Sequence, residues 1–79
     1  MTPREYSHWT KEGTFKITHK LLSGSWFPEL WFRETSLGTY GTPRTAARSI
    51  SEGKHDQEIG FAASALGVPS DPEQWNGFR

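Results

Sequence analysis

A helix with both ends marked is the feature of this sequence that most constrains its fold. The hydroxyl of Thr42 can accept a hydrogen bond from a free N–H of a first helical turn. Pro43 follows at the first helical position, where its fixed φ is already helical. Gly53 stands where a left-handed residue would close the last turn. These signals predict a helix between Thr42 and Gly53, and a helix of only about ten residues must pack on another element to be stable.

One side of this helix is narrow and apolar. Ala46, Ala47 and Ile50 lie three and four residues apart and therefore share a face. Arg44 and Arg48 fall largely on the opposite side, which we expect to face solvent. Because two of the three apolar residues are alanines, the backbone of the helix can approach its neighbour closely. The pattern predicts a helix lying on a sheet.

Three stretches before the helix have the alternation and the residue content of β-strands: 14–22, 26–34 and 37–40. Ser23-Gly24-Ser25 predicts a hairpin between the first two. Pro28 cannot donate to a strand ladder, so it should lie near the strand start or at an open edge. Residues 1–9 are compatible with a further strand and equally with a loose tail.

The C-terminal part predicts short helical elements. Residues 56–66 have helical spacing of apolar side chains, with Asp56 as the cap and Gly60 as a weak point inside. Ser70-Asp71-Pro72 predicts one further helical turn, after which Trp75 should fold back onto the domain. Residues 76–79 should fray.

The predicted fold class is therefore α+β, in one small domain spanning residues 1–79. It has a three-stranded antiparallel sheet, four-stranded if the N-terminal residues pair. One helix packs on a face of the sheet, and a helical C-terminal tail follows. The face toward the helix is expected to carry Phe15, Ile17, Leu21, Leu30 and Phe32.

The opposite face, called the outer face below, is the part of the chain that bears on function. It carries Lys16, Thr18, Lys20, Phe27, Glu29, Trp31 and Arg33. Phe27 and Trp31 make it too apolar for an ordinary solvated surface. Three interpretations stay open: the C-terminal segment covers it, it binds a protein or a second copy, or it binds nucleic acid through its basic and aromatic residues.

A local resemblance bears on the third interpretation. Leu37-Gly38-Thr39-Tyr40, Thr42-Pro43 and Ala46-Ala47-Arg48 resemble the strand-to-helix junction of plant ethylene-response-factor DNA-binding domains, and that of the arm-type domains of tyrosine integrases. The resemblance implies a three-stranded sheet with one helix behind it, the sheet lying in the major groove. It makes Lys16, Lys20, Trp31 and Arg33 the groove-facing residues. The first two strands lack the dense arginines of those families, and Glu29 and Glu34 would oppose phosphate. The whole chain also resembles small single-domain bacterial proteins.

Catalytic and metal-binding patterns are lacking in this sequence. It has no cysteine, and His8, His19 and His55 have no ligand spacing, so we expect no metal and no cofactor. His55-Asp56 is the one close histidine–carboxylate pair, and it is more typical of a helix cap than of a catalytic dyad. On the inner strand face, His19 is expected to be a satisfied structural histidine. No phosphate-binding loop or nucleophile elbow is present, so we expect no enzymatic activity.

Charge and hydropathy limit the partners. Nine basic and nine acidic residues cancel, although residues 1–54 carry eight basic against five acidic residues. No apolar run is long enough for a membrane span and no secretory signal is recognisable, so a cytoplasmic protein without a membrane partner is expected. The sequence favours a non-enzymatic interaction module whose binding surface is Lys16, Lys20, Phe27, Trp31 and Arg33. Its partner is a protein or a second copy, with nucleic acid as the alternative.

Overall fold

The capped helix forms where the sequence predicts it. In the computed structural model, which describes residues 4–78, helix α1 spans Pro43–Ser51. The hydroxyl oxygen of Thr42 accepts a hydrogen bond from the backbone N–H of Thr45 at 3.1 Å. Gly53 lies just past the helix with a φ of 80°, in the left-handed region. Both predicted ends are thus confirmed.

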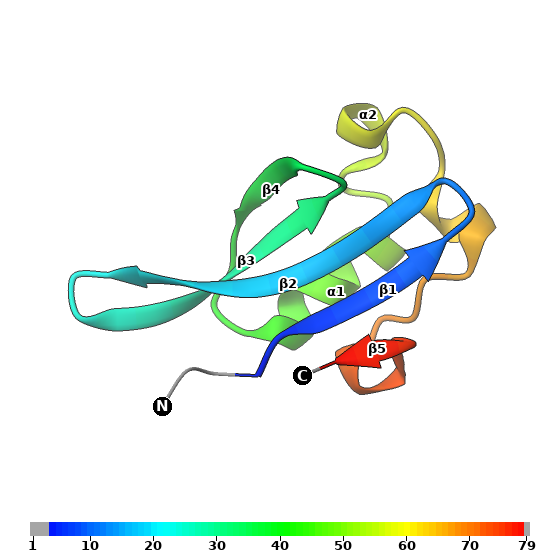
Figure 1. Ribbon diagram of the computed structural model, residues 1–79. Helices are drawn as coiled ribbons and strands as arrows, with labels where there is room; N and C mark the ends of the chain where they lie inside the picture. Colours follow the sequence, from blue (N-terminus) through cyan, green and yellow to red (C-terminus); the bar gives the residue numbers. More distant parts are fainter. Residues whose placement is uncertain (1–3, 79) are drawn as a thin grey trace.

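The sheet is antiparallel throughout, and the predicted α+β architecture is confirmed with four main strands and a two-residue fifth strand at one edge (Figure 1). The strands are β1 (Tyr6–Thr10), β2 (Gly13–Leu22), β3 (Ser25–Phe32), β4 (Thr35–Thr39) and the two-residue β5 (Gly77–Phe78), in the order β4-β3-β2-β1-β5. The N-terminal residues therefore form a strand from Tyr6 onward. A bulge at Leu37 interrupts the pairing of β3 with β4.

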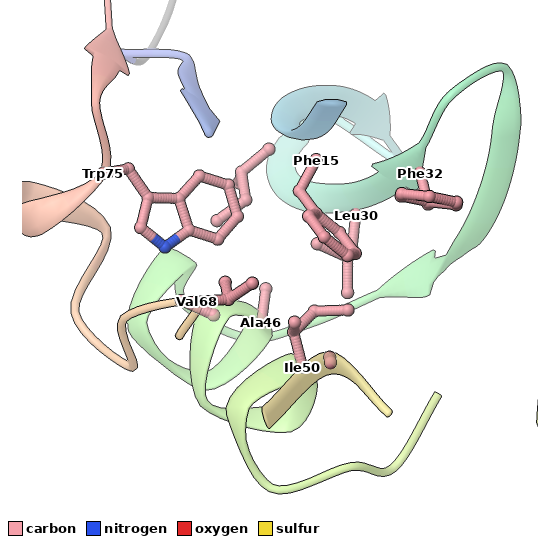
Figure 2. Packing of buried hydrophobic residues seen from close by; sticks show 10 residues of the cluster. Phe15, Leu30, Phe32, Ala46, Ile50, Val68 and Trp75 are labelled. Carbon is pink, nitrogen blue, oxygen red and sulfur yellow. The ribbon is translucent and has the colours of Figure 1, made fainter. Parts of the chain in front are cut away.

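Helix α1 lies on the inner face of the sheet. Phe15, Ile17 and Leu30 from the two central strands are fully buried against it. Ala46 and Ile50 of α1 are buried just as completely, in the same cluster (Figure 2). The alternation of the strands and the periodicity of the helix therefore meet in one core, as the sequence predicts.

The β2–β3 hairpin extends past the rest of the sheet (Figure 1). β1 pairs with β2 only as far as Ile17, and β4 pairs with β3 only from Glu29 onward. Residues 18–28, called the arm below, are therefore mainly a two-stranded ribbon. The prediction that Leu21 belongs to the core is wrong, because its side chain lies on the arm beyond the reach of α1 and is 54% exposed. Of the two positions predicted for Pro28, the open edge is wrong, because Pro28 is buried and its carbonyl accepts from the backbone N–H of Tyr40 at 2.9 Å.

The prediction of one helix over residues 56–66 is wrong, because the helix ends at Gly60. Helix α2 spans only Asp56–Ile59, and Gly60 ends it with a φ of 88°. A 3-10 helix, η1 (Ala63–Leu66), follows. Asp56 does not cap α2 with its side chain. Its carboxylate accepts from the backbone N–H of Ala63 at 3.1 Å and so links the start of α2 to the start of η1.

The C-terminal segment returns to the inner side of the sheet. The predicted helical turn is present as the 3-10 helix η2 (Pro72–Gln74), capped by Asp71. Trp75 is 3% exposed and lies beside Val68 and α1 (Figure 2), as predicted, and its indole N–H donates to the carbonyl of Pro69 at 2.9 Å. This indole completes the inner-side core.

The prediction that residues 76–79 fray is also wrong for residues 76–78, which pair with β1. Gly77 and Phe78 pair with β1 as β5, while residue 79, like residues 1–3, lies outside the described residues. The side-chain amide of Asn76 binds the backbone of Trp9 on both sides, accepting from its N–H at 2.9 Å and donating to its carbonyl at 3.1 Å. Asn76 thereby continues the pairing of β1 where no further strand backbone is available.

The burial of Trp75 predicts a large loss of stability when its ring is removed. We expect Trp75→Ala to lower the free energy of unfolding by about 3–5 kcal/mol, because it leaves a cavity under α1. Trp9→Ala is the matched control, since that ring is 67% exposed and should contribute little. Urea denaturation followed by circular dichroism measures both. Equal losses in the two variants would contradict the placement of Trp75.

The left-handed conformation of Gly53 gives a second prediction. A side chain there is strained by the positive φ, and a Cβ would lie 2.9 Å from a carboxylate oxygen of Asp56. We expect Gly53→Val to destabilise the protein by at least about 1–2 kcal/mol. Gly41→Val is the control, because Gly41 has no positive φ and open space around it. Thermal unfolding of both variants decides, and a Gly53→Val midpoint equal to that of Gly41→Val would be the contrary result.

Candidate interaction face

The outer face is built from cross-strand pairs of β2 and β3. The register sets Lys16 opposite Trp31, Thr18 opposite Glu29, and Lys20 opposite Phe27. Residues directly opposite in an antiparallel pair share a face and lie about 4.5–5.5 Å apart. Six of the seven predicted outer-face residues are therefore brought together as three adjacent pairs, with both lysines on β2 and both aromatic rings on β3.

Trp31 is held in place on this face by a side-chain hydrogen bond. Its indole N–H donates to the hydroxyl oxygen of Thr18 at 3.0 Å, across the seam between the strands. The ring is half-buried in this position. It borders an open depression of about 330 Å³, lined by Lys16, Thr18, Trp31, Arg33 and Glu34. The hydrogen bond fixes the orientation of the ring before any partner arrives.

Arg33 lies at the border of the face in a different way from the other residues. It stands in the turn after β3 with a φ of 56°, outside the regular alternation. Its guanidinium donates from Nε to the carbonyl of Glu12 at 3.0 Å and lies 5.1 Å from the ring centre of Phe32. Arg33 is therefore committed to the neighbouring turn, although part of it still lines the depression.

Large apolar side chains are exposed next to this face. Phe27 is 37% exposed on the arm, and Leu22 is exposed beside it. Leu21 and Trp26 form a second exposed pair on the opposite side of the arm. Exposed aromatic and aliphatic side chains that cluster are typical of interaction sites.

No described segment of the chain covers the outer face. α1 contacts η1, η2, β2 and β3, and η2 also contacts β1, on the inner side. Ala63, Val68 and Trp75 all belong to the inner core. In Figure 1, α1 lies behind the sheet and the outer face is turned toward the viewer. The C-terminal segment, which the sequence left as one candidate cover, thus packs on the other side.

The charged groups of the outer face have few partners within the chain. Among residues 4–78, the ion pairs join Arg4 to Glu73, Arg44 to Asp71, Lys54 to Glu52 and His55 to Glu58, all away from this face. Glu29 accepts a hydrogen bond from the hydroxyl of Ser36 at 2.8 Å, which leaves its second carboxylate oxygen available. Lys16 and Lys20 are exposed beside it.

Two residues that the sequence did not assign to the site adjoin it. The register of β1 with β2 sets Trp9 opposite Thr14, on the outer side, where its ring is exposed. The alternation of residues 6–10 is the signal that could have placed it there. Glu34 lines the depression from the turn after β3. The sequence predicts for Glu34 only that it would oppose phosphate.

The histidine and carboxylate side chains form structural contacts. His55 is buried, and its two ring nitrogens contact the Tyr40 hydroxyl and the Glu58 carboxylate rather than the adjacent Asp56. These two side-chain contacts link Tyr40, which follows β4, to α2. Nδ1 of His8 accepts from the backbone N–H of Asn76 at 3.3 Å. The expectation that His19 is satisfied is not met for one atom, because its buried Nδ1 has no hydrogen-bond partner among the described residues.

Comparison with known proteins assigns no family or function to the outer face. Protein-family models, curated proteins and solved structures were all compared with the chain, and none of them matches it. Within residues 4–78, no cluster of three or more His, Asp or Glu side chains is arranged to hold a metal ion. Over the same residues, no helix is both long and apolar enough to cross a membrane. The functional interpretation therefore depends on the outer face itself.

Two half-buried histidines, His8 and His19, predict a pH dependence of stability. Burial lowers the pKa of His8, and burial, partly opposed by the charge of Glu5, lowers the pKa of His19. Below the ordinary value of 6.5 the unfolded chain therefore binds more protons than the folded chain. We therefore expect the free energy of unfolding to decrease as the pH is lowered from about 7.5 to about 5.5.

Urea denaturation across this pH range measures the effect. In the double variant His8→Gln/His19→Gln, the slope should be smaller than in the unmodified protein, because the two groups no longer titrate. A stability that is constant or rises toward pH 5.5 in the unmodified protein would contradict the assignment.

Proposed function

We propose that the protein is a non-enzymatic interaction module whose outer sheet face binds protein. The observation that carries the proposal is the pair of aromatic side chains, Phe27 and Trp31, on a sheet face that no described segment covers. Aromatic residues are enriched in the buried centres of protein interfaces, with polar residues around them. Lys16, Lys20 and Glu29 supply the polar surroundings here.

The fixed position of Trp31 adds to the support. A side chain that is already ordered loses little rotamer freedom when a partner packs on it, so more of the contact energy appears as affinity. The hydrogen bond to Thr18 provides this order. The depression beside the ring gives a partner side chain a place to enter. Trp31 is therefore expected to contribute more binding energy than any other residue of the face.

Nucleic acid is less well supported as the partner. It would use Lys16, Lys20, Trp31 and Arg33, but the guanidinium of Arg33 is committed to the carbonyl of Glu12. Two carboxylates, Glu29 and Glu34, lie on or beside the same face, and both would repel a phosphate backbone. The mixed charge of the face favours a protein surface, which offers both signs.

Site-specific photo-crosslinking tests the proposal. Replacing Phe27 by a photoreactive phenylalanine analogue puts the probe on the outer face, and the same replacement at Arg48, on the exposed side of α1, is the matched control. Irradiation of cells that contain each variant, followed by mass spectrometry, identifies what is joined to the chain. We expect a discrete protein adduct from position 27 that is absent from position 48.

Two outcomes would overturn the proposal. One is the same set of adducts, or none, from both positions. The other is an adduct from position 27 with nucleic acid in place of protein. An added Trp31→Ala substitution should reduce the protein adduct while circular dichroism shows that the fold is kept.

A further inference from the structure

We infer that the protein that occupies the outer face is a second copy of this chain, packed face to face about a two-fold axis that runs along the β2–β3 seam. This inference rests on the proposed function and names its partner. It follows from the way charge and aromatic groups are sorted between the two central strands, and from the arm that both strands form.

The sorting divides the face into two unlike rows. On β2 the outer positions are Lys16, Thr18 and Lys20, a row with two positive charges and no negative one. The matching row on β3 is Trp31, Glu29 and Phe27, with one negative charge between two rings. Ammonium groups are attracted both to carboxylates and to the faces of aromatic rings. Each row is thus complementary to the other and not to itself.

A two-fold axis along the seam uses this complementarity. Such an axis exchanges the two rows, so that β2 of one copy lies over β3 of the second. Lys16 and Lys20 then face Trp31 and Phe27 of the second copy, and both lysines are within one residue pair of its Glu29. Packed sheets lie about 10 Å apart with their strands nearly aligned, which long lysine side chains can bridge.

The other two-fold arrangement of the same faces is disfavoured by charge. With the axis across the strands, each row would lie on its own counterpart in reverse. Lys16 would then face Lys20 of the second copy, and Glu29 would face Glu29. Like charges opposed across an interface cost free energy. The charge pattern therefore selects the axis along the seam.

The arm gives an independent reason for a second copy. A two-stranded ribbon is at best marginally stable by itself, and the arm has no neighbouring strand over most of its length. With the axis along the seam, both arms extend in the same direction and stack on each other. The exposed ring of Phe27 and the side chain of Leu22 then leave water together.

Paired charge reversals test this arrangement directly. The double variant Lys16→Glu/Lys20→Glu and the single variant Glu29→Lys each put like charges on neighbouring residue pairs across the homodimer interface. Sedimentation velocity over a range of concentrations should show a monomer–dimer equilibrium for the unmodified protein. We expect the dissociation constant of the dimer to rise about tenfold or more in each variant.

Mixing the two variants is the decisive step. In a mixed dimer the new carboxylates of one chain lie one residue pair from the new ammonium group of the other, and the remaining lysines lie one residue pair from the remaining Glu29. We therefore expect the mixture to form heterodimers at concentrations at which each variant alone is monomeric. Lys11→Glu/Arg48→Glu is the control: its charge change equals that of the double variant but lies off the face, so self-association should persist.

The possible results separate this inference from the proposed function. An unmodified protein that stays monomeric up to about millimolar concentration, the weak limit of specific binding, overturns the second-copy inference. So does a mixture that forms no heterodimer although circular dichroism shows both variants folded. If position 27 still crosslinks to a different protein, the interaction face stands and only its occupant changes. The single variant Lys20→Glu, mixed with Glu29→Lys, repeats the test if the double variant does not fold.

Discussion

The close contact between α1 and the sheet is the constraint on which the rest of the structure depends. Ala46, Ala47 and Ile50 bring the helix down onto Phe15 and Leu30, and all five side chains are fully buried. The two alanines allow this close approach because their methyl groups take up little space between the helix backbone and the sheet. Once this contact is made, one face of every strand is committed to the core. The other face is defined by exclusion.

The short chain then uses its remaining residues to extend the same core. One helix of nine residues cannot cover a sheet of this width, and the bare area is filled by Val68 and Trp75 from beyond α2. Packing these residues on the inner side increases the buried apolar surface, which small domains lack. It also leaves the outer side without a covering segment among residues 4–78. The uncovered aromatic residues are thus a consequence of how few residues the core has available.

Features set by neighbouring residues could be predicted from the sequence, and features set by residues far apart in the chain could not. The cap at Thr42 and the left-handed Gly53 act on residues within one turn, so they are visible in the sequence itself. The exposure of Leu21 depends instead on how far the hairpin extends past α1, which no alternation pattern records. The bond from Asn76 to Trp9 joins residues 67 positions apart, and no local rule indicates it.

The candidate site divides in the same way. Alternation correctly places Lys16, Lys20, Phe27 and Trp31 together, because the side-chain period of a strand holds as long as pairing is regular. It fails for Arg33, since the turn there has a positive φ and directs the guanidinium to a neighbouring carbonyl. Whether the face is covered depends on the path of the C-terminal segment, which has weak periodicity and is broken at Gly60.

The position of Trp75 after the four main strands and α1 has a consequence for how the protein is made. Strands β1 to β4 and α1 are complete by residue 51, but the core they share lacks this ring until residue 75 has been added. A nascent chain would therefore display an open apolar groove beside α1, together with the unpaired edge of β1. Such surfaces are the ones that aggregate or recruit chaperones during synthesis. The domain is thus expected to reach its protected state in a single late step rather than gradually along the chain.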